Sequence, residues 1–92
     1  MPACEITISN KLGLHARAAA KFVSLAGRFS CQIRLGRNED PAKCVDGKSI
    51  MSVMLLAAGK GTRLWLHCNG QDQEKAQEAL TALVDNLFDE GE

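Results

Sequence analysis

A histidine and an arginine two residues apart are the side chains of this sequence best suited to group transfer. His15 and Arg17 lie in the stretch NKLGLHARAAAKFV, where a glycine-containing turn leads into a run of alanines that predicts the start of a helix. The first N–H groups of a helix lack intrahelical acceptors, and the helix dipole adds partial positive charge there. A phosphoryl group on the imidazole could therefore bond both these amides and the Arg17 guanidinium.

The predicted helix also presents a basic face beside His15. A spacing of 100° per residue places several polar side chains in one narrow stripe: Arg17, Lys21, Ser24 and Arg28. This stripe would attract phosphate and acidic proteins. An isolated histidine at the junction of a loop and a helix is more often a simple polar cap, so these residues alone leave both interpretations open.

A second segment, SIMSVMLLAA, is apolar around most of its circumference. Ser49 is the expected N-cap of this short helix, and large apolar residues follow it: Ile50, Met51, Val53, Met54, Leu55 and Leu56. A short helix in a domain of this size is hard to surround completely, so we expect part of it to form an exposed docking patch, with burial in the core as the alternative. A phosphate on Ser49 would add about two negative charges beside that patch.

Alternating and helical patterns predict the elements that position these residues. Segments that alternate apolar and polar residues, as half-buried strands do, are Cys4–Asn10, Cys31–Arg37, Thr62–Cys68 and, more weakly, Lys43–Val45. Segments with helical spacing are Ala16–Gly27, Ser49–Ala58 and Asp72–Phe88, the last with Asp72 as its N-cap. The order β-α-β-β-α-β-α with alternating strands predicts an α+β fold whose sheet has helices on one face and an open second face.

Length and composition fit one globular domain over residues 1–92, with an acidic tail at 89–92 that is expected to fray. The net charge is zero, which provides no field to recruit nucleic acid, and no apolar run is long enough to span a bilayer. The N-terminus has neither the basic nor the apolar region of a secretory signal, so the chain is predicted to be cytoplasmic.

The cysteines and the second histidine are predicted to be structural. None of the four cysteines forms a C-x-x-C pair or a zinc-binding spacing, so no metal and no cofactor are expected, and the thiols should be reduced. Cysteines that share the inward strand parity are expected to act as small core residues: Cys4, Cys31 and Cys68. His67 alternates with Arg63 and Trp65 on the open sheet face, which predicts a solvated surface histidine.

The stretches NKLGLHARAAAKF around His15 and GKSIMSVMLLAAGKGT around Ser49, with a closing amphipathic helix, resemble the HPr family of the bacterial phosphoenolpyruvate-dependent phosphotransferase system. The resemblance covers nearly the whole chain, from Cys4 to Phe88. It implies an open-faced sandwich, in which a four-stranded antiparallel sheet of order 1-4-2-3 carries three helices on one face. The residue pattern alone also fits a ferredoxin-like sheet, so the strand order comes from the resemblance.

The resemblance also implies a role for the residues singled out above. His15 would accept a phosphoryl group on Nδ1 from enzyme I and pass it to an enzyme IIA domain, with assistance from Arg17. Ser49 matches the serine that HPr kinase/phosphorylase modifies in some bacteria. The surface that meets these partners, a regulatory protein included, would be formed by Ala20, Lys21, Lys48, Ile50, Met51 and Met54. The chain would thus be a monomeric phosphocarrier and not an enzyme.

Two features depart from the family pattern. The family usually has a proline directly after the arginine, whereas this chain has Ala18. Alanine is a good helix former, so the helix should survive with one additional free N–H and a less rigid start. The hairpin from Arg37 to Val45 is longer than the family's usual one, which leaves the strand register around Cys44 open.

Three alternatives stay open at this level. A nitrogen-type paralogue would feed regulatory proteins instead of sugar permeases, and the residues do not separate it from a sugar-type carrier. A purely regulatory binding module would use Ser49 phosphorylation and the Ile50–Met54 patch without phosphotransfer, but such a module has no need of His15 and Arg17. A metal or redox protein would use the cysteines, and their placement in separate strands argues against it.

Overall fold

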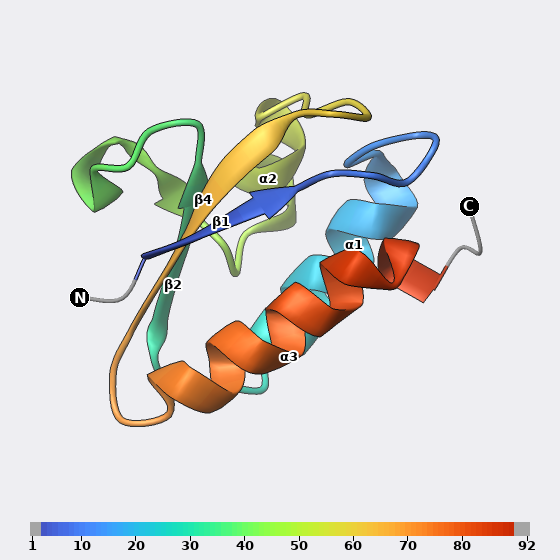
Figure 1. Cartoon of the computed structure of the whole chain (residues 1–92). Helices are drawn as coiled ribbons and strands as arrows, with labels where there is room; N and C mark the ends of the chain where they lie inside the picture. Colours follow the sequence, from blue (N-terminus) through green and yellow to red (C-terminus); the bar gives the residue numbers. More distant parts are fainter. Residues whose placement is uncertain (1–2, 90–92) are drawn as a thin grey trace.

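The computed structural model describes residues 3–89, and its helices and strands follow the predicted order (Figure 1). The strands are β1 (Ala3–Thr7), β2 (Gln32–Gly36), β3 (Val45–Asp46) and β4 (Arg63–Asn69). The helices are α1 (Ala16–Ala26), α2 (Ile50–Leu55) and α3 (Gln73–Asp85), with the 3-10 turns η1 (Pro41–Lys43) and η2 (Leu87–Asp89). Of the tail at 89–92 that is predicted to fray, only Asp89 is described, and it belongs to η2. Within the described residues no helix is long and apolar enough to cross a bilayer.

The strands form one antiparallel sheet in the order β1-β4-β2-β3, as the family resemblance implied. β4 lies between β1 and β2, with Ile6 opposite Leu64 on one side and Leu35 opposite Leu66 on the other. These four residues are buried, which confirms the inward parity predicted for the strands. The short β3 forms the edge next to β2, where Val45 lies opposite Leu35.

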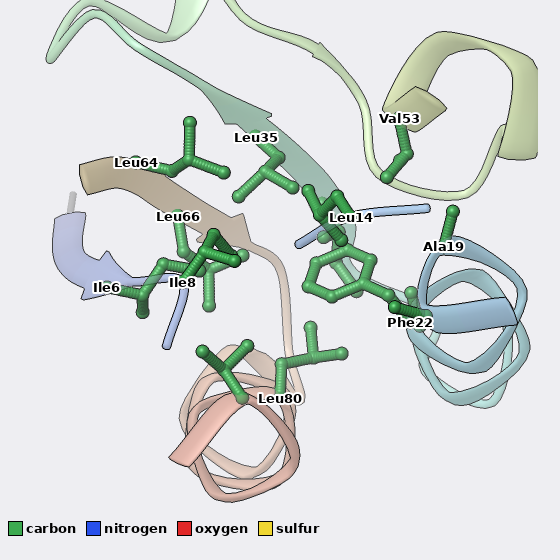
Figure 2. Packing of buried hydrophobic residues seen from close by; sticks show 14 of the residues in the cluster. Ile6, Ile8, Leu14, Ala19, Phe22, Leu35, Val53, Leu64, Leu66 and Leu80 are labelled. Atoms are coloured by element: carbon green, nitrogen blue, oxygen red, sulfur yellow. The ribbon is translucent and has the colours of Figure 1, made fainter. Parts of the chain in front are cut away.

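The helices cover one face of the sheet, and the core forms between the two layers. α1 and α3 lie side by side across this face, and α2 packs against α1 (Figure 1). Figure 2 shows Phe22 of α1 and Leu80 of α3 converging with Ile6, Leu64 and Leu66 of the sheet, and all five are buried. Truncation of one such side chain to alanine typically costs about 2–5 kcal/mol, so this layer dominates the stability of a small domain.

Helices α2 and α3 end earlier than the sequence predicts. α2 stops at Leu55, and Ala57 soon after it adopts the left-handed region with φ +49°. α3 stops at Asp85 instead of Phe88, and the following turn, η2, runs through left-handed residues with φ between 54 and 62°. Burial of Phe88 and a hydrogen bond of 2.9 Å from the Lys21 ammonium to the Phe88 carbonyl hold this turn in place.

The predicted N-cap of α3, Asp72, stands at the start of the helix but does not cap it. Its carboxylate instead accepts the backbone N–H groups of Ser30 and Cys31, each at 2.9 Å. These bonds, the one from Ser30 first, hold the pKa of the Asp72 carboxyl below its usual value, with desolvation opposing the shift. Asp72 thereby fastens the start of β2 to the start of α3.

The hairpin between β2 and β3 contains a 3-10 turn where the sequence predicts a strand. Of the predicted strand Lys43–Val45, Lys43 belongs to η1 and only Val45 is in β3. Between them, Cys44 is buried against β2, so closely that a Cβ added to Gly36 would lie 2.8 Å from its Sγ. Cys44 therefore packs against the end of β2, and the register of this edge pairs Arg34 with Asp46 and Leu35 with Val45.

The cysteines occupy the structural positions that strand parity predicts. Cys31 and Cys68 are buried in the core, Cys4 packs against it half-buried, and all the cysteines are free. Burial raises the pKa of the Cys68 thiol to about 12, and the neighbouring Cys31 and Cys4 add to the shift. A protonated thiol out of reach of solvent is a poor nucleophile, so Cys68 fits a packing role.

Candidate functional site

His15 is the N-cap of α1, the position that the sequence predicts. Its backbone is extended (φ −76°, ψ −178°), and its Nδ1 accepts a hydrogen bond from the N–H of Arg17 at 3.2 Å. Its carbonyl accepts the N–H of Ala19 at 2.8 Å and so begins the helical hydrogen bonding. Only an unprotonated Nδ1 can accept, so the ring presents the lone pair of this nitrogen to the amide end of the helix.

The backbone before His15 is held against the segment that follows α2 (Figure 1). Gly13 adopts φ +69°, and a Cβ at this position would overlap the carbonyl oxygen of Ala58. The N–H of Leu14 donates to that same carbonyl at 2.8 Å. Fully buried Asn10 closes the loop from inside, because its Nδ2 donates to the Gly13 carbonyl at 2.8 Å. The loop that presents the imidazole is therefore fixed on both sides.

The first turn of α1 supplies the donors that an anion needs. The N–H groups of Ala16, Arg17 and Ala18 lie in the turn that has no intrahelical acceptors. Ala18 keeps an N–H that proline would lack, and the helix still begins at Ala16, which confirms that it survives without the proline. The Arg17 side chain is exposed. Backbone donors and a guanidinium thus occur together within three residues of the ring of His15.

The two lysines expected to meet partner proteins, Lys21 and Lys48, are hydrogen-bonded within the protein. The Lys21 ammonium donates to the Phe88 carbonyl at 2.9 Å, and that of Lys48 donates to the Phe29 carbonyl at 2.6 Å. Both lysine side chains are half-buried, whereas Arg17 on the same basic stripe as Lys21 is exposed. The lysines therefore anchor the fold, and their contribution to docking stays a prediction.

Helix α2 buries one side and exposes the other, which confirms the expectation of an exposed patch over complete burial in the core. Val53 is fully buried, whereas the apolar patch, which is at least 40% exposed at each residue, consists of Ile50, Met51, Met54 and Leu55. In the loop before His15, Leu12 is also 67% exposed. Leu12 and Leu55 are not among the docking residues that the family resemblance implies. Leu55 belongs to the same apolar segment, but Leu12 lies outside any periodic segment and carried no signal.

Ser49 is the N-cap of α2, as predicted. Its backbone is extended (φ −112°, ψ 115°), and its Oγ accepts the N–H of Ser52 at 3.3 Å. The residue is half-buried and directly precedes the exposed Ile50. Ser49 therefore lies at the border of the apolar patch, where a phosphate would introduce negative charge.

His67 is buried, and the prediction of a solvated surface histidine is wrong. It is 4% exposed, and its Nε2 has no hydrogen-bond partner among residues 3–89. β4 is a central strand, so His67 is flanked by Ala3 of β1 and Arg34 of β2. Neighbouring strands shield the centre of a sheet face, which alternation within one strand does not reveal. His15 is half-buried, whereas His67 is almost completely closed to solvent.

Chemically, the arrangement around His15 suits a transferable anion. An unprotonated ring nitrogen is a nucleophile, the helix amides are donors with partial positive charge, and the guanidinium is a planar donor for phosphate. In the part of the chain that the structure describes, no three or more His, Cys, Asp or Glu residues are grouped so as to hold a metal ion.

Comparisons with known proteins place these features in one family. The family described as "PTS HPr component phosphorylation site" matches residues 3–86. The chain is 67% identical over 92 residues to phosphocarrier protein HPr of Pseudomonas aeruginosa, with 100% of both chains covered. It is 42% identical to phosphocarrier protein NPr of Shewanella violacea, over 94% of this chain and 91% of that protein. A crystal structure of HPr-C-His from Thermoanaerobacter tengcongensis matches with a TM-score of 0.87 and 43% identity, over 98% of each chain.

Proposed function

The chain belongs to the HPr family of phosphocarriers, and from that premise we propose that Nδ1 of His15 accepts a phosphoryl group from enzyme I and donates it to enzyme IIA domains. The observation that supports this most directly is the hydrogen bond of 3.2 Å between Nδ1 and the Arg17 N–H at the start of α1. It shows an acceptor nitrogen lying where helix amides can take an anion. The burial of His67 removes the competing imidazole. The protein would act in the cytoplasm as a carrier and not as an enzyme.

In this proposal the transfer step runs between two ring nitrogens. The Nδ1 lone pair attacks the phosphorus of the enzyme I phosphohistidine, and a new P–N bond forms as the old one breaks. The donor ring carries a proton on its other nitrogen and leaves as neutral imidazole. The His15 ring keeps its Nε2 proton and becomes a phosphorylated imidazolium, so no proton passes between the two rings. Once the phosphoryl group is bonded to Nδ1, the Arg17 N–H donates its hydrogen bond to a phosphate oxygen instead of to the ring nitrogen. The Arg17 guanidinium makes a second contact to the phosphate. Because these donors do not enclose the group, the next protein can take it.

Incubation with phosphoenolpyruvate and enzyme I, followed by mass mapping of the acid-labile phosphate, tests the assignment. We expect label on His15, complete loss in His15→Ala and retention in the control variant His67→Gln. Circular dichroism of both variants separates loss of the site from loss of the fold. Label that persists in His15→Ala would place the phosphoryl group on another residue and refute the assignment.

We further propose that the apolar patch and exposed Arg17 meet both partner proteins, and that phosphorylation of Ser49 by an HPr kinase/phosphorylase regulates this docking. The proposal is supported by the position of Ser49 next to the patch and by the repulsion that its phosphate would exert on acidic partners. Ser49→Asp and Ser49→Asn both keep an N-cap and differ in charge. We expect the KM of enzyme I to be higher for the Ser49→Asp carrier than for the wild type and little changed for Ser49→Asn. Equal KM values for the two variants would contradict this role of Ser49.

Identity to relatives named HPr extends from 67% down to 43%, next to the 42% for NPr, so both the sugar-type and the nitrogen-type relay stay candidates. Both types would use the same acceptor chemistry, so the site does not separate them. Parallel transfer assays with sugar-type and nitrogen-type enzyme I would do so. Faster transfer from the nitrogen-type enzyme would identify a nitrogen-type relay, faster transfer from the sugar-type enzyme would identify a sugar-type relay, and either result leaves the assignment of His15 untouched.

A further inference from the structure

The guanidinium of Arg37 holds the end of α2 from outside the helix. Arg37 follows β2, and its Nη2 donates to the carbonyl of Leu56 at 2.8 Å and more weakly to that of Ala57 at 3.5 Å. The last carbonyls of a helix lack intrahelical partners and carry partial negative charge, which favours a cationic donor. Ala57 is left-handed, with φ +49°, and a non-glycine residue keeps that conformation only with support from its surroundings.

The peptide group that Arg37 contacts continues into the backbone that holds the loop before His15. The Ala57 carbonyl and the Ala58 N–H belong to the same planar peptide. The next carbonyl along the chain, that of Ala58, accepts the Leu14 N–H at 2.8 Å. A rotation of the peptide between residues 57 and 58 would therefore move the acceptor that fixes the residue directly before His15.

We propose that Arg37 is a positioning residue for phosphoryl transfer at His15. It acts through two successive backbone contacts, its own hydrogen bonds to the end of α2 and the hydrogen bond between Ala58 and Leu14. The inference rests on the proposed function of His15 and adds a residue from a different part of the chain, the loop after β2. Because small displacements of reacting groups strongly reduce transfer rates, a slight shift of the loop is enough to be measured.

Three variants test the proposal in the full chain. Arg37→Gln removes the cationic donor, Arg37→Lys keeps a cation, and Arg63→Gln is the matched control because its side chain is 73% exposed on β4. Rates of transfer from phosphorylated enzyme I are measured over a range of carrier concentrations. We expect Arg37→Gln to lower kcat about two- to tenfold, the range that one hydrogen bond supports, with KM unchanged. Arg37→Lys should recover part of the loss, and Arg63→Gln should match the wild type.

A second measurement does not depend on phosphoryl transfer. Hydrogen exchange at the Leu14 amide reports its bond to Ala58, and we expect it to be about two- to tenfold faster in Arg37→Gln but unchanged in Arg63→Gln. Denaturant unfolding of each variant corrects for any change in global stability. Failure of the wild type to accept phosphate would refute the proposed function, while Leu14 exchange would still test the inference. Unchanged exchange of the Leu14 amide in Arg37→Gln would overturn the inference. An effect on KM alone would also overturn it, because it would indicate that Arg37 contacts the partner protein directly.

Discussion

Gly13, two residues before the candidate phosphoryl acceptor, should tolerate a methyl group worse than the glycines near it. Its φ is +69°, and an added Cβ would overlap the Ala58 carbonyl oxygen and lie 2.8 Å from the Cα of Gly59. Two other glycines separate these two sources of cost. Gly61 has φ +91° but open space around an added Cβ, and Gly59 has open space without a left-handed φ. Alanine at these three positions therefore forms a graded series.

The expected magnitudes follow from those differences. Gly59→Ala should be neutral or stabilise the protein by about 0.4–1 kcal/mol, because alanine restricts the unfolded chain. Gly61→Ala adds a left-handed cost of about 1–2 kcal/mol, partly offset by that entropy. Gly13→Ala has the same left-handed cost and must also displace the packed backbone of Ala58 and Gly59, which costs about 1–3 kcal/mol by analogy with overpacked cores. The free energy of unfolding should therefore fall by about 2–4 kcal/mol in total. This is a large share of the roughly 5–15 kcal/mol by which native proteins are stable.

Urea unfolding monitored by circular dichroism measures the three free energies, and label uptake from phosphoenolpyruvate and enzyme I measures the effect on function. Folded Gly13→Ala should also take up phosphate more slowly than Gly61→Ala, because the loop that places His15 has moved. Equal stability of Gly13→Ala and Gly61→Ala would refute the reasoning, since it would mean that the contact between Gly13 and Ala58 is not tight.

Three further predictions concern stability and thiol reactivity. Ala57→Gly should raise the free energy of unfolding by up to about 1 kcal/mol, because φ +49° strains alanine more than glycine; a loss of stability in urea would contradict this. Asp72→Asn should lower the unfolding midpoint near neutral pH. The ionised carboxylate stabilises the fold fully above pH 3.8, the ordinary pKa of an aspartate, and this stabilisation is lost as the pH falls through the lower pKa of Asp72 in the folded protein. The difference in midpoint between wild type and Asp72→Asn should therefore disappear at low pH. A difference that does not depend on pH would exclude the ionised carboxylate as its cause. Fully buried Cys68, with a pKa of about 12, should resist iodoacetamide in the native protein while half-buried Cys4 reacts, and peptide mapping that finds equal labelling would disprove its protection.

Features that depend on adjacent residues could be predicted from the sequence. His15 and Ser49 cap their helices as expected, because a cap needs only its own side chain and the next few amides. The alternating and helical patterns located the segments that supply most of the core, because burial of one face imposes a period on the sequence. The strand order came from the family resemblance, which two contiguous stretches carried.

Features that depend on distant residues could not be predicted in this way. Asp72 has the sequence context of an N-cap, but the amides of Ser30 and Cys31 take its carboxylate. His67 alternates with polar residues as a surface residue would, yet its place in a central strand buries it. In neither case does the neighbouring sequence indicate the residues that the fold brings close.

By itself, then, the sequence determined that a histidine lies at a helix start, and the resemblance to the HPr family made that side chain the candidate phosphoryl acceptor. Only the tertiary structure decided what holds that side chain in place: Ala58 against the loop before His15, and Arg37 at the end of the helix that leads to Ala58. The physical reason is that caps and periodic faces are local, whereas these backbone contacts exist only once the helices have packed on the sheet.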